Sequence, residues 1–106
     1  MKEIDNTKYE VKGTSRFKKQ LKKVIKQGKD INKLIEVLNV LANGEFLEEK
    51  YHNHKLINNN YYKDCFKCHI EPDWLLVYKY NNNQLLLILI GTGSHSELFE
   101  KWVKSI

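Results

Sequence analysis

The sequence predicts an α+β fold in which a helical hairpin packs on one face of a twisted, mainly antiparallel sheet. Two segments with apolar residues at helical spacing follow each other closely within residues 14–44. Three segments rich in aromatic and branched residues follow within residues 61–90, and an amphipathic segment begins near residue 94. The predicted order of elements is therefore β-α-α-β-β-β-α.

The first predicted element is a short strand in which Tyr9 and Val11 alternate with polar residues, and it ends at Gly13. A helix follows, with Thr14 or Ser15 as its N-cap. Its apolar face is formed by Phe17, Leu21, Val24 and Ile25, and its remaining surface carries Lys18, Lys19, Lys22, Lys23 and Lys26.

Gly28 stops the first helix, and Asp30 can cap a second one that closes at Gly44. The inner stripe of the second helix consists of Ile31, Leu34, Ile35, Leu38 and Leu41. Because the connection is so short, we expect the two helices to form an antiparallel hairpin.

Residues 45–60 are mostly polar and are predicted to form the longest loop. Strands are predicted over residues 61–69, 74–80 and 84–90, with residues 81–83 as a hairpin turn. The last of these strands is apolar at every position after Gln84, which predicts a central strand buried on both faces. The C-terminal helix should begin near Ser94 or Ser96 and turn inward Leu98, Phe99, Trp102, Val103 and Ile106.

The length of 106 residues indicates one domain, residues 1–106, and 42% hydrophobic residues suffice for one core. The sequence has no apolar stretch long enough to cross a bilayer and no N-terminal signal peptide. We therefore expect a cytoplasmic protein with reduced cysteines and no membrane partner. The net charge of +5 favours an anionic partner.

Cys65, Cys68 and His69 match the C-x-x-C-H spacing that attaches a c-type haem. With His52 and His54 the two thiols would also supply a ligand set for structural zinc. Residues three apart in a strand point to opposite faces, which argues against both interpretations. We expect two reduced thiols, one in the core and one near the surface, and neither a metal nor a cofactor; a zinc site is the minor alternative.

A second interpretation of the same region is an acid–base cluster. His69 ends one predicted strand, Asp73 opens the next, His95 opens the last helix and His54 lies in the preceding loop. The ends of neighbouring strands and a helix N-terminus can gather such side chains, and neutral imidazoles beside a carboxylate can move protons near pH 7. The alternative is that each histidine lies at the surface with an unrelated hydrogen bond.

The strings "HKL", "CHIEPDWLLVYK" and "GTGSHSELF" follow a basic helical hairpin in this order. In this combination the chain resembles the YafQ branch of the RelE/ParE toxin superfamily, most strongly over residues 51–99. The resemblance implies a toxin of a type II toxin–antitoxin pair that cuts messenger RNA in the ribosomal A site without a metal. In the implied reaction a base takes the proton of a ribose 2′-hydroxyl, that oxygen attacks the adjacent phosphorus, and an acid protonates the leaving 5′-oxygen.

The resemblance also implies roles for individual residues. His54, His69, Asp73 and His95 match the catalytic positions, and we expect His95 and Asp73 nearest the proton transfers. The assignment of acid and base is open. Trp74 and Phe99 match two aromatic positions that contact substrate, with packing in the core as the alternative for each. His52 has no counterpart and is interpreted as a surface residue.

Gly91 departs from the family pattern, which usually has an arginine four residues before the position of His95. That arginine would hold the scissile phosphate, and loss of one such contact commonly costs about 100- to 1,000-fold in rate. We therefore expect weakened cleavage, with Lys67 or Lys55 supplying charge in poorer geometry.

The resemblance implies three partners: a cognate antitoxin in a hetero-oligomer, the ribosome and messenger RNA. The lysines of the first helix, with Lys50 and Lys55, are a candidate surface for ribosomal RNA, although a charged helix face can also be merely solvated. Two other functions stay open. They are a non-catalytic toxin of the same fold that inhibits a protein such as gyrase, and a small zinc- or nucleic-acid-binding module.

Overall fold

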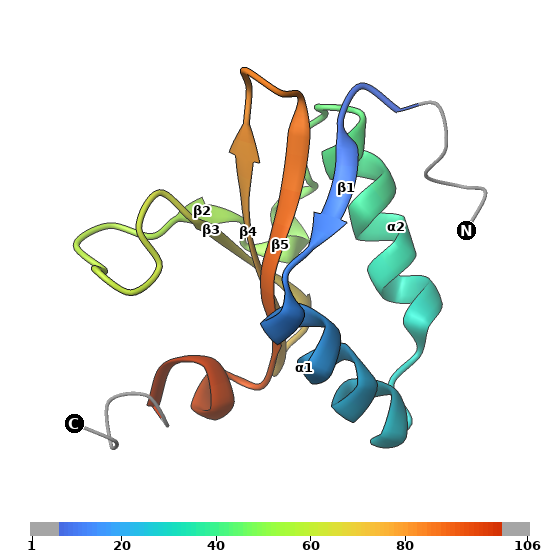
Figure 1. Cartoon of the computed structure of the whole chain (residues 1–106). Coiled ribbons are helices and arrows are strands. Elements are labelled where there is room, and N and C mark those ends of the chain that lie inside the picture. Colours follow the sequence, from blue (N-terminus) through green and yellow to red (C-terminus); the bar gives the residue numbers. More distant parts are fainter. Residues whose placement is uncertain (1–6, 101–106) are drawn as a thin grey trace.

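The computed structural model describes residues 7–100 and places five strands in one sheet, in the order β1-β5-β4-β3-β2 (Figure 1). The strands are β1 (Glu10–Gly13), β2 (His54–Lys55), β3 (Phe66–Glu71), β4 (Trp74–Asn81) and β5 (Leu86–Gly93). β1 pairs with β5 in parallel, and every other pairing is antiparallel. The predicted α+β class and the mainly antiparallel sheet are confirmed.

The two predicted helices are α1 (Ser15–Lys26) and α2 (Ile31–Ala42). The hydroxyl of Thr14 accepts the backbone N–H of Phe17 at 3.1 Å, which satisfies an otherwise unpaired donor of the first turn. Asp30 caps α2 in the same way through the N–H of Asn32. Both predicted caps are confirmed, because capping depends on residues a few positions apart.

The predicted loop over residues 45–60 contains two short elements. These are a 3₁₀ turn, η2 (Glu49–Tyr51), and the edge strand β2. The following strand begins at Phe66, later than the predicted residue 61. The physical reason is a turn in which Asn59 Oδ1 accepts the backbone N–H groups of Tyr61 and Tyr62, at 3.0 Å each.

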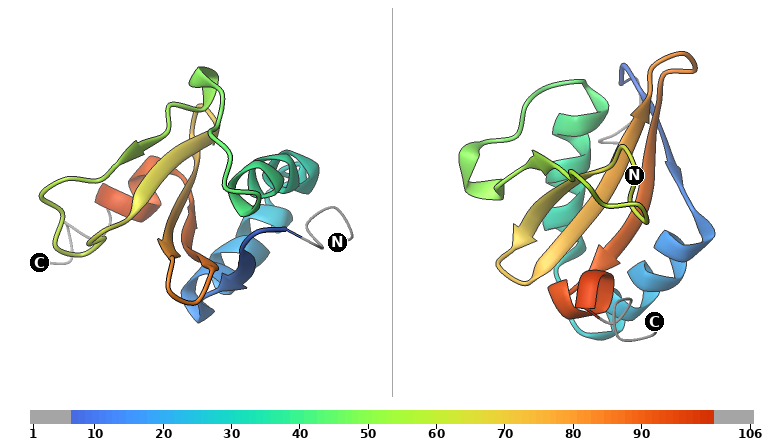
Figure 2. Two further views of the ribbon diagram at one scale, coloured as in Figure 1. Left: turned by 90° about the horizontal axis from the view of Figure 1, so that it is seen from above. Right: turned by 90° about the vertical axis from the view of Figure 1, so that its left-hand side faces the viewer.

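Buried side chains form two clusters on opposite faces of the sheet. The helix-side cluster contains Tyr9, Phe17, Val24, Leu34, Val37, Leu38, Leu41, Ala42, Cys68, Ile70, Trp74, Leu76, Tyr78, Leu87 and Leu89. The η3-side cluster contains Tyr62, Cys65, Leu75, Val77 and Leu98, and includes part of the π-type helical turn η3 (Ser96–Glu100). Figure 2 shows the strands between α2 and η3.

The prediction that residues 84–90 form a central strand buried on both faces is only partly correct, because β5 is an interior strand between β1 and β4 but is not buried along its whole length. β4 holds the middle of the sheet, and its first five residues, 74–78, are all buried. In β5, Leu87 and Leu89 are buried against the helix-side cluster, whereas Leu86 and Ile88 are only half-buried. The small η3-side cluster does not extend over that end of β5.

Cys65 and Cys68 belong to opposite clusters, as the strand argument predicts. The expectation that one thiol lies near the surface is wrong, because Cys65 is 3% exposed and Cys68 is 0% exposed. η3 begins where a C-terminal helix is predicted, and Leu98 is buried as expected. Trp102, Val103 and Ile106 lie outside the described residues. Within residues 7–100, no helix is long and apolar enough to cross a membrane.

Candidate active site

The strand register places one row of residues across the sheet. His54 on β2 lies opposite Lys67 on β3, Lys67 lies opposite Val77 on β4, and Val77 lies opposite Gly91 on β5. Directly opposed residues share a face of a sheet. Because Val77 belongs to the η3-side cluster, His54, Lys67 and Gly91 lie on the face that η3 covers.

His69 lies on the same face, two residues after Lys67 and opposite Leu75 of the η3-side cluster. Its Nδ1 is 3.2 Å from the carbonyl oxygen of Pro72, in the turn between β3 and β4. The Nδ1 of His54 is likewise 3.0 Å from the carbonyl oxygen of His52. A carbonyl oxygen only accepts, so each Nδ1 carries a proton and each neutral ring has an unprotonated Nε2.

Asp73 connects the turn between β3 and β4 to the start of η3. Its Oδ1 accepts the backbone N–H of His95 at 3.0 Å, although the two residues are 22 positions apart. His95 and Asp73 are both exposed. The predicted pair of acid and imidazole residues is therefore in direct contact, through the backbone of His95.

The first turn of η3 is held by a reciprocal pair of hydrogen bonds. The Ser94 N–H donates to Glu97 Oε1 at 3.0 Å, and the Glu97 N–H donates to Ser94 Oγ at 3.1 Å. Lys23 on α1 forms an ion pair with Glu97. The hydrogen bond from Lys23, followed by that from the Ser94 N–H, lowers the pKa of the Glu97 carboxyl.

Phe99 joins the two parts of the site. Its ring centroid is 5.1 Å from that of His95, and Lys67 Nζ lies 5.1 Å from the same Phe99 centroid. The ring is only partly buried, and it also contacts Tyr62 of the η3-side cluster. Phe99 thus packs against Tyr62 of the core and also contacts His95 and Lys67 of the site.

Two predicted site residues lie elsewhere. Trp74 is 1% exposed in the helix-side cluster, and its Nε1 donates to Thr92 Oγ1 at 2.9 Å. Of the two roles considered for Trp74, this position fits packing, because the ring has no exposed face for a base. Lys55 lies opposite Phe66, whose side chain packs on the helix-side cluster, so Lys55 is on the other face of the sheet from His54.

His52 is exposed, in agreement with its interpretation as a surface residue. However, it contacts both neighbouring histidines of the site. Its carbonyl oxygen meets His54, and its ring lies edge-on to His69, with centroids 5.6 Å apart and an interplanar angle of 78°. Its positive φ of 47°, which no sequence signal indicates, sets this geometry.

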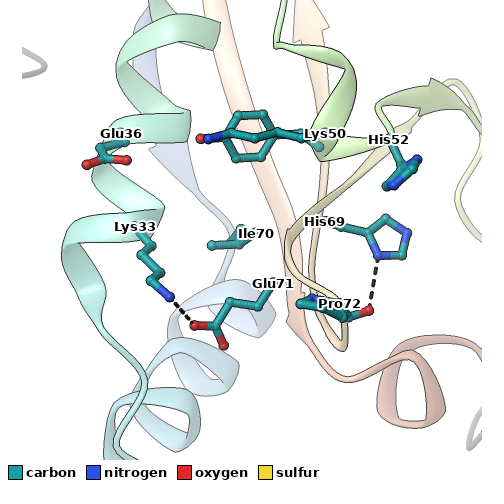
Figure 3. A pocket seen from close by; sticks show the side chains of 9 residues that line it. Lys33, Glu36, Lys50, His52, His69, Ile70, Glu71 and Pro72 are labelled. Carbon is teal, nitrogen blue, oxygen red and sulfur yellow. Dashed lines mark hydrogen bonds and ion pairs between the residues drawn. The ribbon is translucent and has the colours of Figure 1, made fainter.

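Two pockets border the candidate site. One of about 530 Å³ lies between α2, η2 and the end of β3, with His52 and His69 at one wall and the Lys33–Glu71 ion pair at the other (Figure 3). The second, of about 440 Å³, is lined by the asparagines 58–60 together with Tyr61, Tyr62, Leu98 and Phe99. Phe99 therefore forms part of a pocket next to His95.

The zinc alternative has little support in the described part of the chain. Within residues 7–100, no group of three His, Cys, Asp or Glu side chains is arranged to hold a metal ion. The two thiols cannot share an ion because the sheet separates them. Burial also raises the pKa of the Cys68 thiol to about 12, which disfavours the thiolate that binds metals.

Residues 9–100 match the family described as bacterial toxin of type II toxin–antitoxin system, YafQ. The chain belongs to this family. The mRNA interferase toxin YafQ of Escherichia coli K12 is 33% identical over 91 residues, which are 85% of this chain and 95% of that protein.

Solved structures of bacterial toxins agree with this assignment. A metal-bound toxin from Helicobacter pylori is 38% identical, has a TM-score of 0.80, and is matched over 86% of this chain and 99% of its own. YafQ in a DinJ–YafQ complex of E. coli is 34% identical, has a TM-score of 0.76, and is matched over 86% of this chain and 98% of its own. The predicted YafQ branch and its fold are thereby confirmed.

Proposed function

We propose that this YafQ-family chain is a ribosome-dependent endoribonuclease that cuts messenger RNA by intramolecular attack of a ribose 2′-hydroxyl. The observation that supports this most is the convergence of His54, Lys67 and His69 on the sheet face next to the contact between Asp73 and His95. The relatives named mRNA interferase toxins agree with RNA as the substrate.

The reaction needs a base and an acid on either side of one phosphodiester. The base removes the 2′-hydroxyl proton, the bond from O2′ to phosphorus forms, and the bond from phosphorus to O5′ breaks. The leaving O5′ takes a proton from the acid, so that the products are a 2′,3′-cyclic phosphate and a 5′-hydroxyl. No step of this scheme is assigned to a metal.

The hydrogen bonds of His54, His69 and Asp73 restrict which of their atoms can accept a proton from the substrate. In their neutral forms His54 and His69 present Nε2 as a proton acceptor, because Nδ1 donates to a backbone carbonyl in each. Asp73 uses Oδ1 to hold the His95 backbone, which leaves Oδ2 to accept a proton or orient the ribose. The His95 ring is held against Phe99 and completes the set of proton carriers.

We expect the site to provide less positive charge to the scissile phosphate than the family pattern implies. Lys67 lies on the site face and Gly91 lies in the same row, where an arginine is expected from the family resemblance. Lysine offers a point charge in place of the planar fork of a guanidinium. We therefore propose that cleavage by this chain is weaker than that of a relative that keeps the arginine.

The proposed partners are a cognate antitoxin, the ribosome and messenger RNA. The solved DinJ–YafQ complexes support an antitoxin that forms a hetero-oligomer with this chain. The exposed lysines of α1, namely Lys18, Lys19, Lys22, Lys23 and Lys26, support an acidic or polyanionic partner on that helix.

The test is to map 5′ ends of cellular transcripts after induction of the wild type, Asp73→Asn and Asp64→Asn. Asp73→Asn keeps an oxygen that can accept the His95 N–H but removes the charge. Asp64→Asn makes the same change at an exposed loop residue. Cuts in phase with codons that disappear only in Asp73→Asn are expected. Wild-type cells without such cuts, or equal cutting by all three proteins, would contradict the proposal.

A further inference from the structure

We propose that His52 is a positioning residue that orients both His54 and His69, an inference that rests on the proposed endoribonuclease function. His52 contacts His54 through its backbone carbonyl oxygen and His69 through its ring. Neither contact follows from the sequence pattern, because His52 is exposed and lies at the end of a short 3₁₀ turn.

The backbone of His52 is the first component of this arrangement. Its φ and ψ of 47° and 46° lie in the left-handed region, which non-glycine residues seldom occupy. Its N–H donates to the carbonyl oxygen of Glu49 at 3.0 Å and closes η2. The next residue, Asn53, accepts the hydroxyl of the buried Tyr78 at 2.7 Å. Unusual backbone geometry that is held on both sides is a frequent feature of functional sites.

The carbonyl of His52 is the second component. Its oxygen accepts from His54 Nδ1 at 3.0 Å, which fixes the tautomer with an unprotonated Nε2. Without this partner, the His54 imidazole can carry its proton on Nε2 instead of Nδ1. An Nε2 that already carries a proton cannot accept the proton of a ribose hydroxyl. The conformation of His52 therefore determines which nitrogen of His54 is available for chemistry.

The ring of His52 is the third component. It meets the ring of His69 edge-on, at 5.6 Å between centroids, while His69 Nδ1 faces the Pro72 carbonyl on the other side (Figure 3). The His52 ring and the Pro72 carbonyl oxygen thus contact the His69 ring on different sides, and together they fix the direction in which its Nε2 points. An aromatic edge contact of this kind has a preferred geometry and therefore restricts ring rotation.

Three substitutions separate these contributions. His52→Gly keeps the left-handed backbone and the carbonyl but removes the ring. His52→Phe restores a ring that cannot ionise. His52→Val introduces a β-branched side chain that disfavours positive φ and should move the carbonyl away from His54. Leu85→Val is the matched control, because Leu85 also has a positive φ, 53°, but lies in the β4–β5 turn.

The first readout is the ¹⁵N chemical shifts of the histidine ring nitrogens in the intact protein, which report tautomers without any need for RNA cleavage. We expect the wild type, His52→Gly and Leu85→Val to keep the Nδ1–H form of His54. His52→Val should lose it, and His52→Gly should shift the His69 ring signals while His52→Phe leaves them near their wild-type values. A His54 tautomer unchanged in His52→Val, or a His69 ring unchanged in His52→Gly, would overturn the inference.

The second readout is the cleavage rate on translated messages, where misplacement of a catalytic group by about 1 Å can cost up to about 100-fold. His52→Gly and His52→Val should be slowed, and His52→Phe and Leu85→Val should stay within about threefold of the wild type. Normal rates in His52→Gly and His52→Val would overturn the positioning role alone. An inactive wild type with the expected tautomers would instead contradict the proposed function.

Discussion

The side-chain oxygen of Gln20, on α1, accepts the backbone N–H of Thr92, on β5, at 3.0 Å. This bond depends on the residue before Thr92 being glycine. A Cβ atom at Gly91 would lie 2.9 Å from Gln20 Oε1 and 3.4 Å from Leu98 Cδ2. The position at which the family resemblance implies an arginine is therefore occupied by the amide of Gln20. The backbone at Gly91 has no positive φ, so a Cβ atom there is opposed by the Gln20 contact and not by the backbone conformation.

Gly91→Arg should increase cleavage. Gln20 is flexible and can move aside, and the new guanidinium would enter the row that contains Lys67 and His54. An electrostatic contact of this kind is commonly worth about 100- to 1,000-fold in rate. The measurement is the rate of cleavage of translated messages, together with growth inhibition on induction.

Gly91→Ala is the control for this substitution, because it displaces Gln20 without adding charge. It should lower the free energy of unfolding by about 1 kcal/mol through the lost Gln20–Thr92 hydrogen bond, and it should not accelerate cleavage. If Gly91→Arg is no faster and no more toxic than the wild type, the idea that Gly91 weakens this chain fails.

Trp74→Phe should act on stability more than on cleavage. Trp74 Nε1 donates to Thr92 Oγ1, which in turn donates to the Leu75 carbonyl oxygen at 2.8 Å, and all three residues are buried. Removing the indole donor should cost about 1–3 kcal/mol in the free energy of unfolding, measured with urea.

A double-mutant cycle with Thr92→Val separates this bond from packing. The two substitutions should be non-additive, since either one breaks the link between Trp74 and Thr92. A loss of cleavage by Trp74→Phe with an unchanged free energy of unfolding would show instead that the indole contacts substrate.

Glu97→Gln should remove a pH-dependent part of the stability. Lys23 and the Ser94 N–H lower the pKa of Glu97 from its ordinary 4.5 in the folded protein. A lowered folded-state pKa stabilises the fold above the unfolded-state pKa, and this contribution is lost as the pH falls through the folded-state value.

The difference in unfolding free energy between the wild type and Glu97→Gln should therefore be largest near neutral pH, and it should shrink as the pH falls below the ordinary carboxyl value of 4.5 and through the lowered folded-state pKa. Its size should be at most about 1 kcal/mol, because the ion pair is partly exposed and glutamine can still serve in the reciprocal cap. Glu45→Gln, in an exposed loop, is the control. A difference that grows toward low pH would contradict the assignment.

Both cysteines should resist alkylation until the protein unfolds. Burial raises the pKa of Cys65, and it raises that of Cys68 to about 12, so little thiolate is present at neutral pH. The measurement is the rate of modification by iodoacetamide across a urea titration, with and without zinc. Rapid modification of the folded protein, or protection by zinc, would favour the metal-binding alternative over the separated thiols.

Binding to ribosomes should weaken steeply with salt if α1 contacts RNA. Each lysine that meets a phosphate releases counterions, and its loss should reduce the slope of log K against log salt by about 0.7–0.9. Lys18→Gln, Lys19→Gln and Lys22→Gln test α1, with Lys8→Gln and Lys12→Gln as charge-matched controls near β1. A binding constant that does not vary with salt would remove α1 from the interface.

The sequence by itself determined the order of the main elements and the family. Apolar periodicity and caps such as Thr14 and Asp30 act over a few residues, so they can be read without knowledge of the fold. The sequence also identifies His69, Asp73 and His95 as candidate site residues, because they lie in the short strings "CHIEPDW" and "GTGSH", which can be recognised without knowledge of the fold. The placement of Cys65 and Cys68 on opposite faces of the sheet also follows from the sequence alone, because side chains alternate between the two faces along a strand.

Only the tertiary structure decided how these residues meet. The register that aligns His54 with Lys67 depends on β2, an edge strand of two residues that lacks a periodic signal. The burial of Trp74 depends on which face of β4 the helices cover, and the contacts of His52 depend on a left-handed backbone at a non-glycine residue. Pairing, layering and unusual dihedral angles are settled by contacts between distant segments, and for that reason no local pattern in the sequence predicts them.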